Sequence, residues 1–213
     1  MKGKLDLFFD FKIMGANAYV PFIITLLLVL YSNLRKDALT HIIPALELTF
    51  PVFAAWWSIF IFQNILEEPG SETIFSYPLS RWQVGILRVA FFFIFYVLLM
   101  IVMLLLIDRI CIASIFFPLT VQLGSEAFFF AGLGFWAMTM TSNAGWSLVL
   151  IIIYSSMQIL TRGALFPMIN VFLFNDRLLK ISELWPSSGY NLLLGAMLWI
   201  WAQIVFSKFQ RYN

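Results

Sequence analysis

The chain of 213 residues is 62% hydrophobic and only 11% charged, with a formal net charge of +2. Ordinary soluble domains carry about 25% charged residues, so this composition excludes that class. The small net charge and the scattered Lys and Arg residues also argue against a nucleic-acid-binding surface. Because the apolar residues form long uninterrupted runs, we predict an all-α integral membrane protein.

Residues 1–15 predict a short amphipathic helix that precedes the first apolar run. On a helical wheel the apolar residues of this segment share one side, and the charged residues lie four apart on another side, namely Lys2, Asp6 and Asp10. A helix of this kind lies in the membrane interface instead of crossing the bilayer. No small-residue cleavage site follows the first long run, so we expect that run to be retained as a span.

Six runs have nearly the length that a membrane-spanning helix needs, which is about 20 residues for a hydrocarbon layer of about 30 Å. They cover residues 16–33, 40–63, 84–107, 115–140, 145–162 and 190–207. We therefore predict a single six-span domain over residues 16–213. Pro44 and Pro51 predict a kink in the second span, and Ser80 with Gln83 predicts a capping box at the start of the third.

The segment between the fifth and sixth spans is too short to cross the membrane. Its apolar part, Ala164 to Phe174, has eleven residues, which suits a helix that dips into the bilayer or lies flat on it. Asn175 is a candidate cap for a following short helix, which Pro186 is expected to end. We therefore predict two short dipping helices on the extracellular face.

Charge gives only a weak indication of orientation. An even number of spans puts both termini on one side, and three N-terminal lysines favour the cytoplasm. In that arrangement, however, seven basic residues lie inside and six outside, so the positive-inside signal is small.

One polar, turn-rich stretch, EEPGSETIFSYPLSRWQVG, separates the second and third spans. Gly70 permits a turn, Ser71 can cap a two-turn helix over residues 71–77, and Pro78 must end that helix. The alternative is a solvated loop whose Gly and Pro residues only reverse the chain.

The order of residues in this stretch closely resembles the cytoplasmic loop of type-2 ABC transporter permeases. In that family the loop reads acidic residue, Gly-Thr or Gly-Ser, Glu, a short apolar helix, Leu-Pro or Tyr-Pro, and then Ser-Arg. The matching residues are Glu68, Gly70-Ser71-Glu72-Thr73 and Tyr77-Pro78-Leu79-Ser80-Arg81. One mild departure is Ser71, where the family more often has Thr; a serine hydroxyl can still cap the helix.

The resemblance implies that residues 64–83, here named the coupling loop, carry a coupling helix that docks on a separate ATPase subunit. The residues expected to take part are Glu67, Glu68, Gly70, Ser71, Glu72, Thr73, Phe75, Tyr77, Pro78, Ser80 and Arg81. It also implies cytoplasmic termini, a second permease in a homodimer or heterodimer, and ATP and Mg²⁺ bound by the partner. The chain has no G-x-x-x-x-G-K-[ST] motif, so we expect neither a cofactor nor ATP hydrolysis in this chain.

Two acids lie at membrane depth, where charged groups are costly and mark candidate functional positions. Glu47 lies in the second predicted span, and Gln122 and Glu126 are four residues apart in the fourth. These three residues are candidates for the lining of a translocation path. The alternative is that they join helices by hydrogen bonds within the bundle.

Enzymatic readings have little support in the sequence. A single Cys111 and a single His41 provide neither a metal site nor a catalytic triad. Glu67-Glu68 resembles the E-E-x-x-x-R motif of a family of membrane proteases, but Glu72 stands where that motif requires arginine.

We therefore expect a permease subunit of an ABC exporter in a bacterial plasma membrane, in contact with lipid. Its cargo would be a small drug, an antimicrobial peptide or a lipid-like molecule. The competing hypothesis is an ion-coupled secondary transporter or channel that acts without an ATPase. The sequence leaves the transported substrate open, and also the choice between a role in export and one in immunity.

Overall fold

The computed structural model describes residues 7–35, 39–67, 80–111, 115–174 and 178–208. Within these residues, six helical stretches are long and apolar enough to cross a membrane, as predicted: Gly15–Leu34, Leu39–Leu66, Gln83–Cys111, Phe116–Thr141, Ala144–Thr161 and Ile181–Ser207. Eight of the residues predicted to take part in coupling, all between Glu68 and Pro78, lie outside the described part of the chain.

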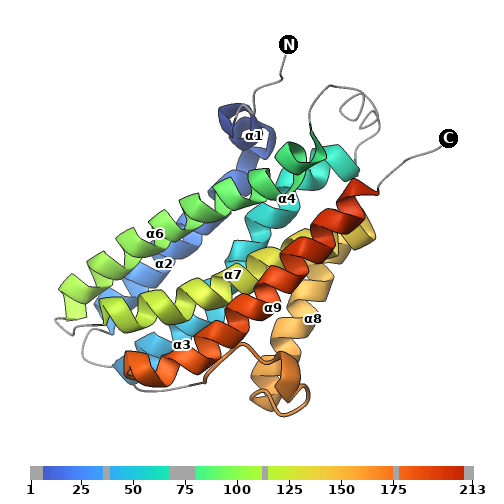
Figure 1. The fold of residues 1–213 in the computed structure, drawn as a ribbon. Coiled ribbons are helices and arrows are strands. Elements are labelled where there is room, and N and C mark those ends of the chain that lie inside the picture. The colour runs from blue at the N-terminus through green and yellow to red at the C-terminus, as the bar shows by residue number, and fades with distance from the viewer. Residues whose placement is uncertain (1–6, 36–38, 68–79, 112–114, 175–177, 209–213) are drawn as a thin grey trace.

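The helices follow one another up and down the bundle (Figure 1). A short helix α1 (Leu7–Ile13) precedes a 3-10 turn and α2 (Val20–Leu34). The second span consists of α3 (Leu39–Thr49), a 3-10 turn (Pro51–Phe53) and α4 (Ala54–Leu66). After the coupling loop come a π-helical turn (Gln83–Leu87), α6 (Arg88–Cys111), α7 (Phe116–Thr141), α8 (Ala144–Thr161) and α9 (Ile181–Ser207).

The second span changes from α-helix to 3-10 helix at Pro51, one of the two prolines that predicted a kink. Proline has no backbone N–H and cannot complete the helical hydrogen-bond ladder. Nearby, the Tyr96 hydroxyl of α6 donates a hydrogen bond to the Phe50 carbonyl, and the Tyr96 ring stacks on Phe50 with centroids 4.6 Å apart. The third span thus supplies a partner for backbone at the interruption.

Helix α7 occupies the centre of the bundle and packs against α4, α6, α8 and α9. Small residues allow its closest approaches. A Cβ atom on Gly134 would lie 2.7 Å from the carbonyl oxygen of Ala55 in α4, and one on Gly195 of α9 would lie 3.1 Å from the Cα atom of Phe129 in α7. Such contacts between backbones are typical of helix packing within membranes.

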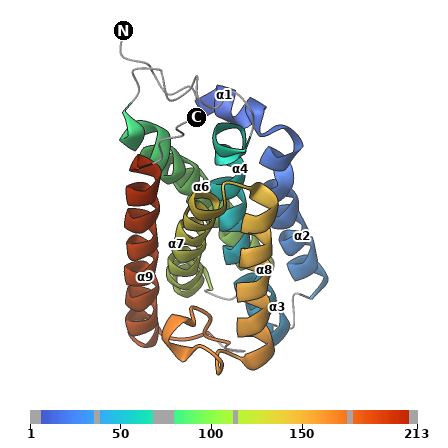
Figure 2. The same cartoon turned by 90° about the vertical axis from the view of Figure 1, so that its right-hand side faces the viewer.

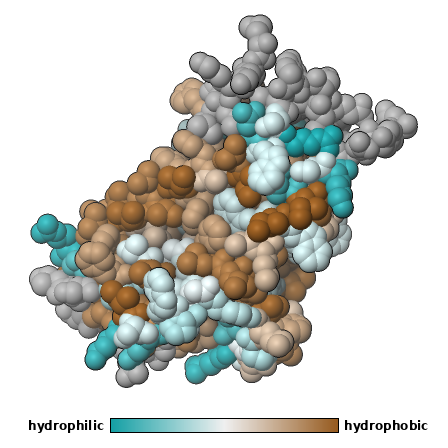
Figure 3. All heavy atoms as spheres, viewed as in Figure 1, coloured by the Kyte–Doolittle hydropathy of each residue, from teal (hydrophilic) through white to brown (hydrophobic). Residues whose placement is uncertain are grey.

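The bundle has two distinct ends (Figure 2). Helix α1, the end of α4, the turn between α7 and α8 and the end of α9 lie at one end, which we name the α1 end. The connection between α8 and α9 lies at the opposite end. In the face shown in Figure 3, apolar side chains dominate the middle and hydrophilic ones gather toward the ends. This is the surface expected of a multi-helix membrane protein.

The segment between α8 and α9 differs from the predicted pair of short helices. Its described residues before α9 contain one 3-10 turn, Pro167–Ile169, and no α-helix. The expectation that Pro186 ends a helix is wrong, because α9 begins at Ile181 and continues through Pro186 to Ser207. The carbonyl group that Pro186 leaves without its usual donor belongs to Ser182, an exposed residue in the first turn of α9, where the loss is tolerated.

Candidate functional site

The described flanks of the coupling loop include three of the predicted coupling residues, Glu67, Ser80 and Arg81. Glu67 follows the last residue of α4, and Ser80 and Arg81 precede the π-helical turn that leads into α6. The other predicted coupling residues lie outside the described residues: Glu68, Gly70, Ser71, Glu72, Thr73, Phe75, Tyr77 and Pro78.

Glu67 fastens the first flank of the loop to the start of α8. Its Oε1 accepts a hydrogen bond of 3.0 Å from the Asn143 side-chain amide, and its Oε2 accepts one of 3.1 Å from the backbone N–H of Ala144. Asn143 is itself the N-cap of α8 and accepts from the N–H of Trp146. A carboxylate at a helix N-terminus is favourable, by about 0.3–1 kcal/mol, because it meets free N–H groups and the positive end of the helix dipole.

Ser80 begins the second flank with the predicted capping box. The N–H of Gln83 donates to the Ser80 hydroxyl at 3.3 Å, and the N–H of Ser80 donates to the Gln83 side chain at 3.4 Å. This reciprocal pair satisfies donors at the start of the helix. The sequence prediction of a capping box at this position is confirmed.

The second flank is also fastened to the end of α9. The Arg81 guanidinium donates to the carbonyl of Ser207, one of the last carbonyls of α9. The Gln203 side chain accepts a hydrogen bond of 2.8 Å from the N–H of Ile86 and donates one of 3.3 Å to the carbonyl of Arg81. Both flanks of the coupling loop are therefore bonded to other spans, one to α8 and one to α9.

Gly85 is needed for this contact with Gln203. Its backbone departs from helical geometry, with φ −89° and ψ −108°, inside the π-helical turn. A Cβ atom at this position would lie 2.2 Å from Oε1 of Gln203. Sequence reasoning missed both residues, although a glutamine within a strongly apolar run is a signal that marks a buried hydrogen bond.

A buried ion pair connects α1 to α6 at the same end. The Arg88 Nε donates to Asp10 Oδ2 at 2.7 Å, and Nη2 donates to Oδ1, so the contact is bidentate. The two side chains are only 9% and 8% exposed. Asp10, one of the charged residues of the predicted amphipathic helix, turns inward to the guanidinium, whereas Phe8 is 82% exposed.

The three candidate path residues lie in the interior of the chain, away from the α1 end. Glu47 and Glu126 are both fully buried, and Gln122 is 4% exposed. One Glu47 oxygen accepts hydrogen bonds from the backbone N–H groups of Leu173 and Phe174, the latter at 2.9 Å. Glu126 lies close enough to Glu47 for the two carboxyl groups to interact electrostatically. The structure thus brings these residues together.

Residues 166–174 close over this interior layer and are held by side chains of α8 and α9. The hydroxyl of Tyr154 donates to the Ile169 carbonyl at 2.5 Å, and the Asn191 amide donates to the Val171 carbonyl at 3.0 Å. Tyr190 donates to the carbonyl of Met168. The connection between α8 and α9 is therefore fastened at several points, and Val171 and Phe172 are buried.

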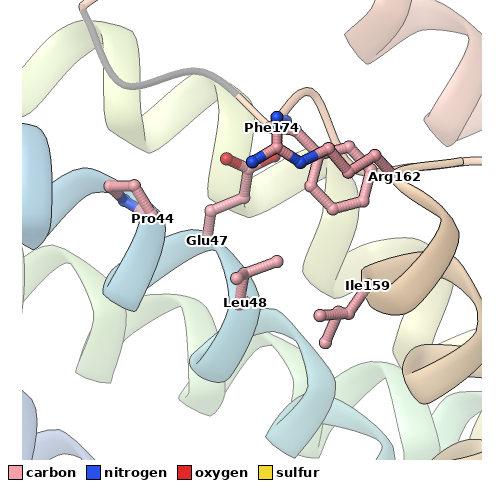
Figure 4. A pocket seen from close by; sticks show the side chains of 6 residues that line it. All are labelled: Pro44, Glu47, Leu48, Ile159, Arg162 and Phe174. Carbon is pink, nitrogen blue, oxygen red and sulfur yellow. The ribbon is translucent and has the colours of Figure 1, made fainter.

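A small pocket lies where α3, the end of α8 and this connection meet (Figure 4). Its volume is about 260 Å³, and its lining consists of Pro44, Glu47, Leu48, Ile159, Arg162 and Phe174. The Glu47 and Arg162 side chains point toward each other, above apolar walls (Figure 4). Sites that enclose drug-sized ligands usually measure about 300–1,000 Å³, so this pocket alone is too small for such a molecule.

No family model, curated protein or solved structure matches this chain. The fold and the polar contacts therefore define the class of the protein by themselves. In the part of the chain that the structure describes, it is an all-helical protein with six helices long and apolar enough to cross a membrane, a polar interior layer, and a loop whose flanks are bonded to two other helices.

Proposed function

We propose that this chain is the permease subunit of an ATP-driven ABC exporter and that its coupling loop receives motion from a separate ATPase subunit. The observation that carries the proposal is the attachment of both loop flanks, through Glu67 to the N-terminus of α8 and through Arg81 to the C-terminus of α9. The order of residues in the loop, which resembles that of type-2 permeases, supports it independently.

These attachments provide a physical route for coupling. Helices are stiff, so a displacement of the loop that moves Glu67 also moves the start of α8, and one that moves Arg81 and Gln203 also moves the end of α9. Both helices run to the far end of the bundle, where they hold residues 166–174 through Tyr154 and Asn191. Motion at the α1 end would thereby reach the connection at the opposite end.

The proposal has definite consequences for partners and location. ATP and Mg²⁺ would bind to the partner ATPase, two permease chains would form the path in a bacterial plasma membrane, and the α1 end would face the cytoplasm. Small drugs, antimicrobial peptides or lipid-like molecules are the expected cargo. Glu47, Gln122 and Glu126 would border that path only if it runs through the interior of each chain.

Co-purification followed by coupled activity tests the proposal. The tagged chain is isolated from its native membranes in mild detergent, co-purified subunits are identified by mass spectrometry, and ATP hydrolysis by the reconstituted complex is measured with a panel of peptides, drugs and lipids. We expect a nucleotide-binding subunit whose activity the panel stimulates. A chain that transports cargo alone would refute the proposal.

Variants of the coupling loop sharpen this test. Glu72→Ala and Tyr77→Ala are expected to lower transport and coupled ATPase activity several-fold without changing membrane insertion. Glu183→Ala, an exposed position in the first turn of α9, is the matched control and should retain both activities. Wild-type activity in both loop variants would contradict the assignment of the loop.

An ion-coupled secondary transporter is the alternative, and the proximity of two buried acids, Glu47 and Glu126, is the observation that favours it. Buried ionisable groups at membrane depth often take part in proton or ion pathways. Proteoliposomes that contain this chain alone would then accumulate cargo in response to an ion gradient, without ATP.

A further inference from the structure

Glu126 occupies an unusual position among the buried polar side chains of the chain. It lies midway along α7 and is completely inaccessible to solvent. Among the residues that the structure describes, no donor reaches either of its carboxyl oxygens in hydrogen-bonding geometry. Gln122 lies one turn earlier on the same face, where its side chain interacts with Glu126, and its Nε2 also makes no hydrogen bond of normal geometry to a described residue.

Among the residues that the structure describes, none supplies a positive charge that interacts with Glu126. The described groups that interact with it electrostatically are Glu47 from α3, which is also acidic, and the Tyr154 phenol from α8. On α9 the titratable neighbour is Tyr190, which interacts with Tyr154. Helix α4 has no titratable residue, and the Tyr96 hydroxyl of α6 is bonded to the Phe50 carbonyl.

Glu47 has the opposite environment. Two backbone N–H groups, those of Leu173 and Phe174, donate to its Oε1. Hydrogen bonds from backbone amides stabilise a carboxylate, whereas a buried carboxylate without donors or a cation is prohibitively costly. When two nearby acids have such different environments, the one with donors keeps the charge and the other takes the proton.

We propose that Glu126 is a proton-binding site, and that the buried Glu47–Glu126 pair holds one proton on Glu126 beneath residues 171–174. The proton comes from water and returns to water, with no other change in covalent bonding. The inference does not rest on the proposed exporter function, because it concerns the resting chain alone. It assigns a chemical state to the polar interior layer and identifies the connection between α8 and α9 as the cover of that site.

Infrared spectroscopy of the reconstituted chain tests this assignment directly. At neutral pH we expect the carbonyl-stretch band of a protonated carboxylic acid. Its intensity should correspond to one protonated carboxyl group per chain. The band should move to lower frequency when glutamate is labelled with ¹³C in the side-chain carboxyl, and should stay in place when aspartate is labelled. It should vanish in Glu126→Gln and persist in the control Glu183→Gln.

Several results would overturn the proposal. These are a wild-type spectrum without the band at neutral pH, a band that ¹³C-glutamate does not move, or a band that survives in Glu126→Gln. A band that appears only when sodium and potassium are removed would instead assign the site to an alkali-metal ion. If Glu126→Gln yields no monodisperse protein, persistence of the labelled band in both Glu47→Gln and Glu67→Gln supports Glu126, and its loss in either contradicts the proposal.

Discussion

The network at the α1 end and the layer around Glu126 show two different ways in which this chain places polar groups among apolar helices. At the α1 end, Asp10 is paired with Arg88, and Glu67 accepts two hydrogen bonds at the start of α8. Around Glu126, by contrast, no described donor reaches the carboxyl group. The first arrangement fixes helices relative to one another. In the second, the Glu126 carboxyl group has no such partners and is neutralised by binding a proton. Substitutions at the two places should therefore have different effects.

The largest effect is expected at the ion pair between α1 and α6. Asp10→Ala leaves the buried Arg88 guanidinium without its partner, so the free energy of unfolding should fall by about 3–5 kcal/mol. Equilibrium unfolding of the purified chain in detergent measures it. Lys12→Ala, at an exposed position of the same helix, is the control. A loss below about 1 kcal/mol in Asp10→Ala would mean that the pair is solvated.

Gly85→Ala is expected to have the next largest effect. The added methyl group would meet the Gln203 side chain, so overpacking should cost about 1–3 kcal/mol of stability. Gly189→Ala is a suitable control, because an added Cβ meets no atom within 4 Å there among the described residues. The double variant Gly85→Ala/Gln203→Ala should recover part of the loss in the same unfolding assay, and a purely additive result would argue against this collision.

Glu67→Ala should have a smaller effect on stability, about 0.3–1 kcal/mol, since it removes the carboxylate that accepts hydrogen bonds at the N-terminus of α8. Hydrogen exchange of the amides of Ala144 and the first turn of α8 is the most direct measurement, and it should be faster in the variant. The same variant should lower coupled ATPase activity in the complex, whereas Glu183→Ala should not. Unchanged exchange at Ala144 would show that Glu67 does not hold the start of α8.

The smallest effect is expected for Glu126→Gln. A neutral carboxylic acid and an amide have similar size and polarity, so stability should change by less than about 1 kcal/mol if Glu126 is protonated. Glu47→Gln should cost more, because it removes the charge that two backbone N–H groups stabilise. A larger loss of stability in Glu126→Gln than in Glu47→Gln would contradict the assignment of the proton to Glu126 and of the charge to Glu47.

Several features were predictable because they depend on neighbouring residues in the chain. The six spans follow from runs of apolar residues, the change to 3-10 helix follows from Pro51, and the start of the third span follows from Ser80 and Gln83. The prediction that Pro186 ends a helix was wrong because the local sequence alone does not decide whether a helix continues through a proline. A proline in an early turn of a helix is compatible with its continuation, and the packing of α9 against α7 determines that outcome.

By itself, the sequence determined the class of the protein, the number of its spans and the position of the polar loop between the second and third, because length and hydrophobicity are local properties. Only the tertiary structure decided the partners of the polar residues. Asp10 and Arg88 are 78 positions apart, Glu67 and Ala144 are 77 apart, and Gln203 and Ile86 are 117 apart. Such pairs depend on which helices pack together, and close approaches at glycines such as Gly134 and Gly195 determine that packing.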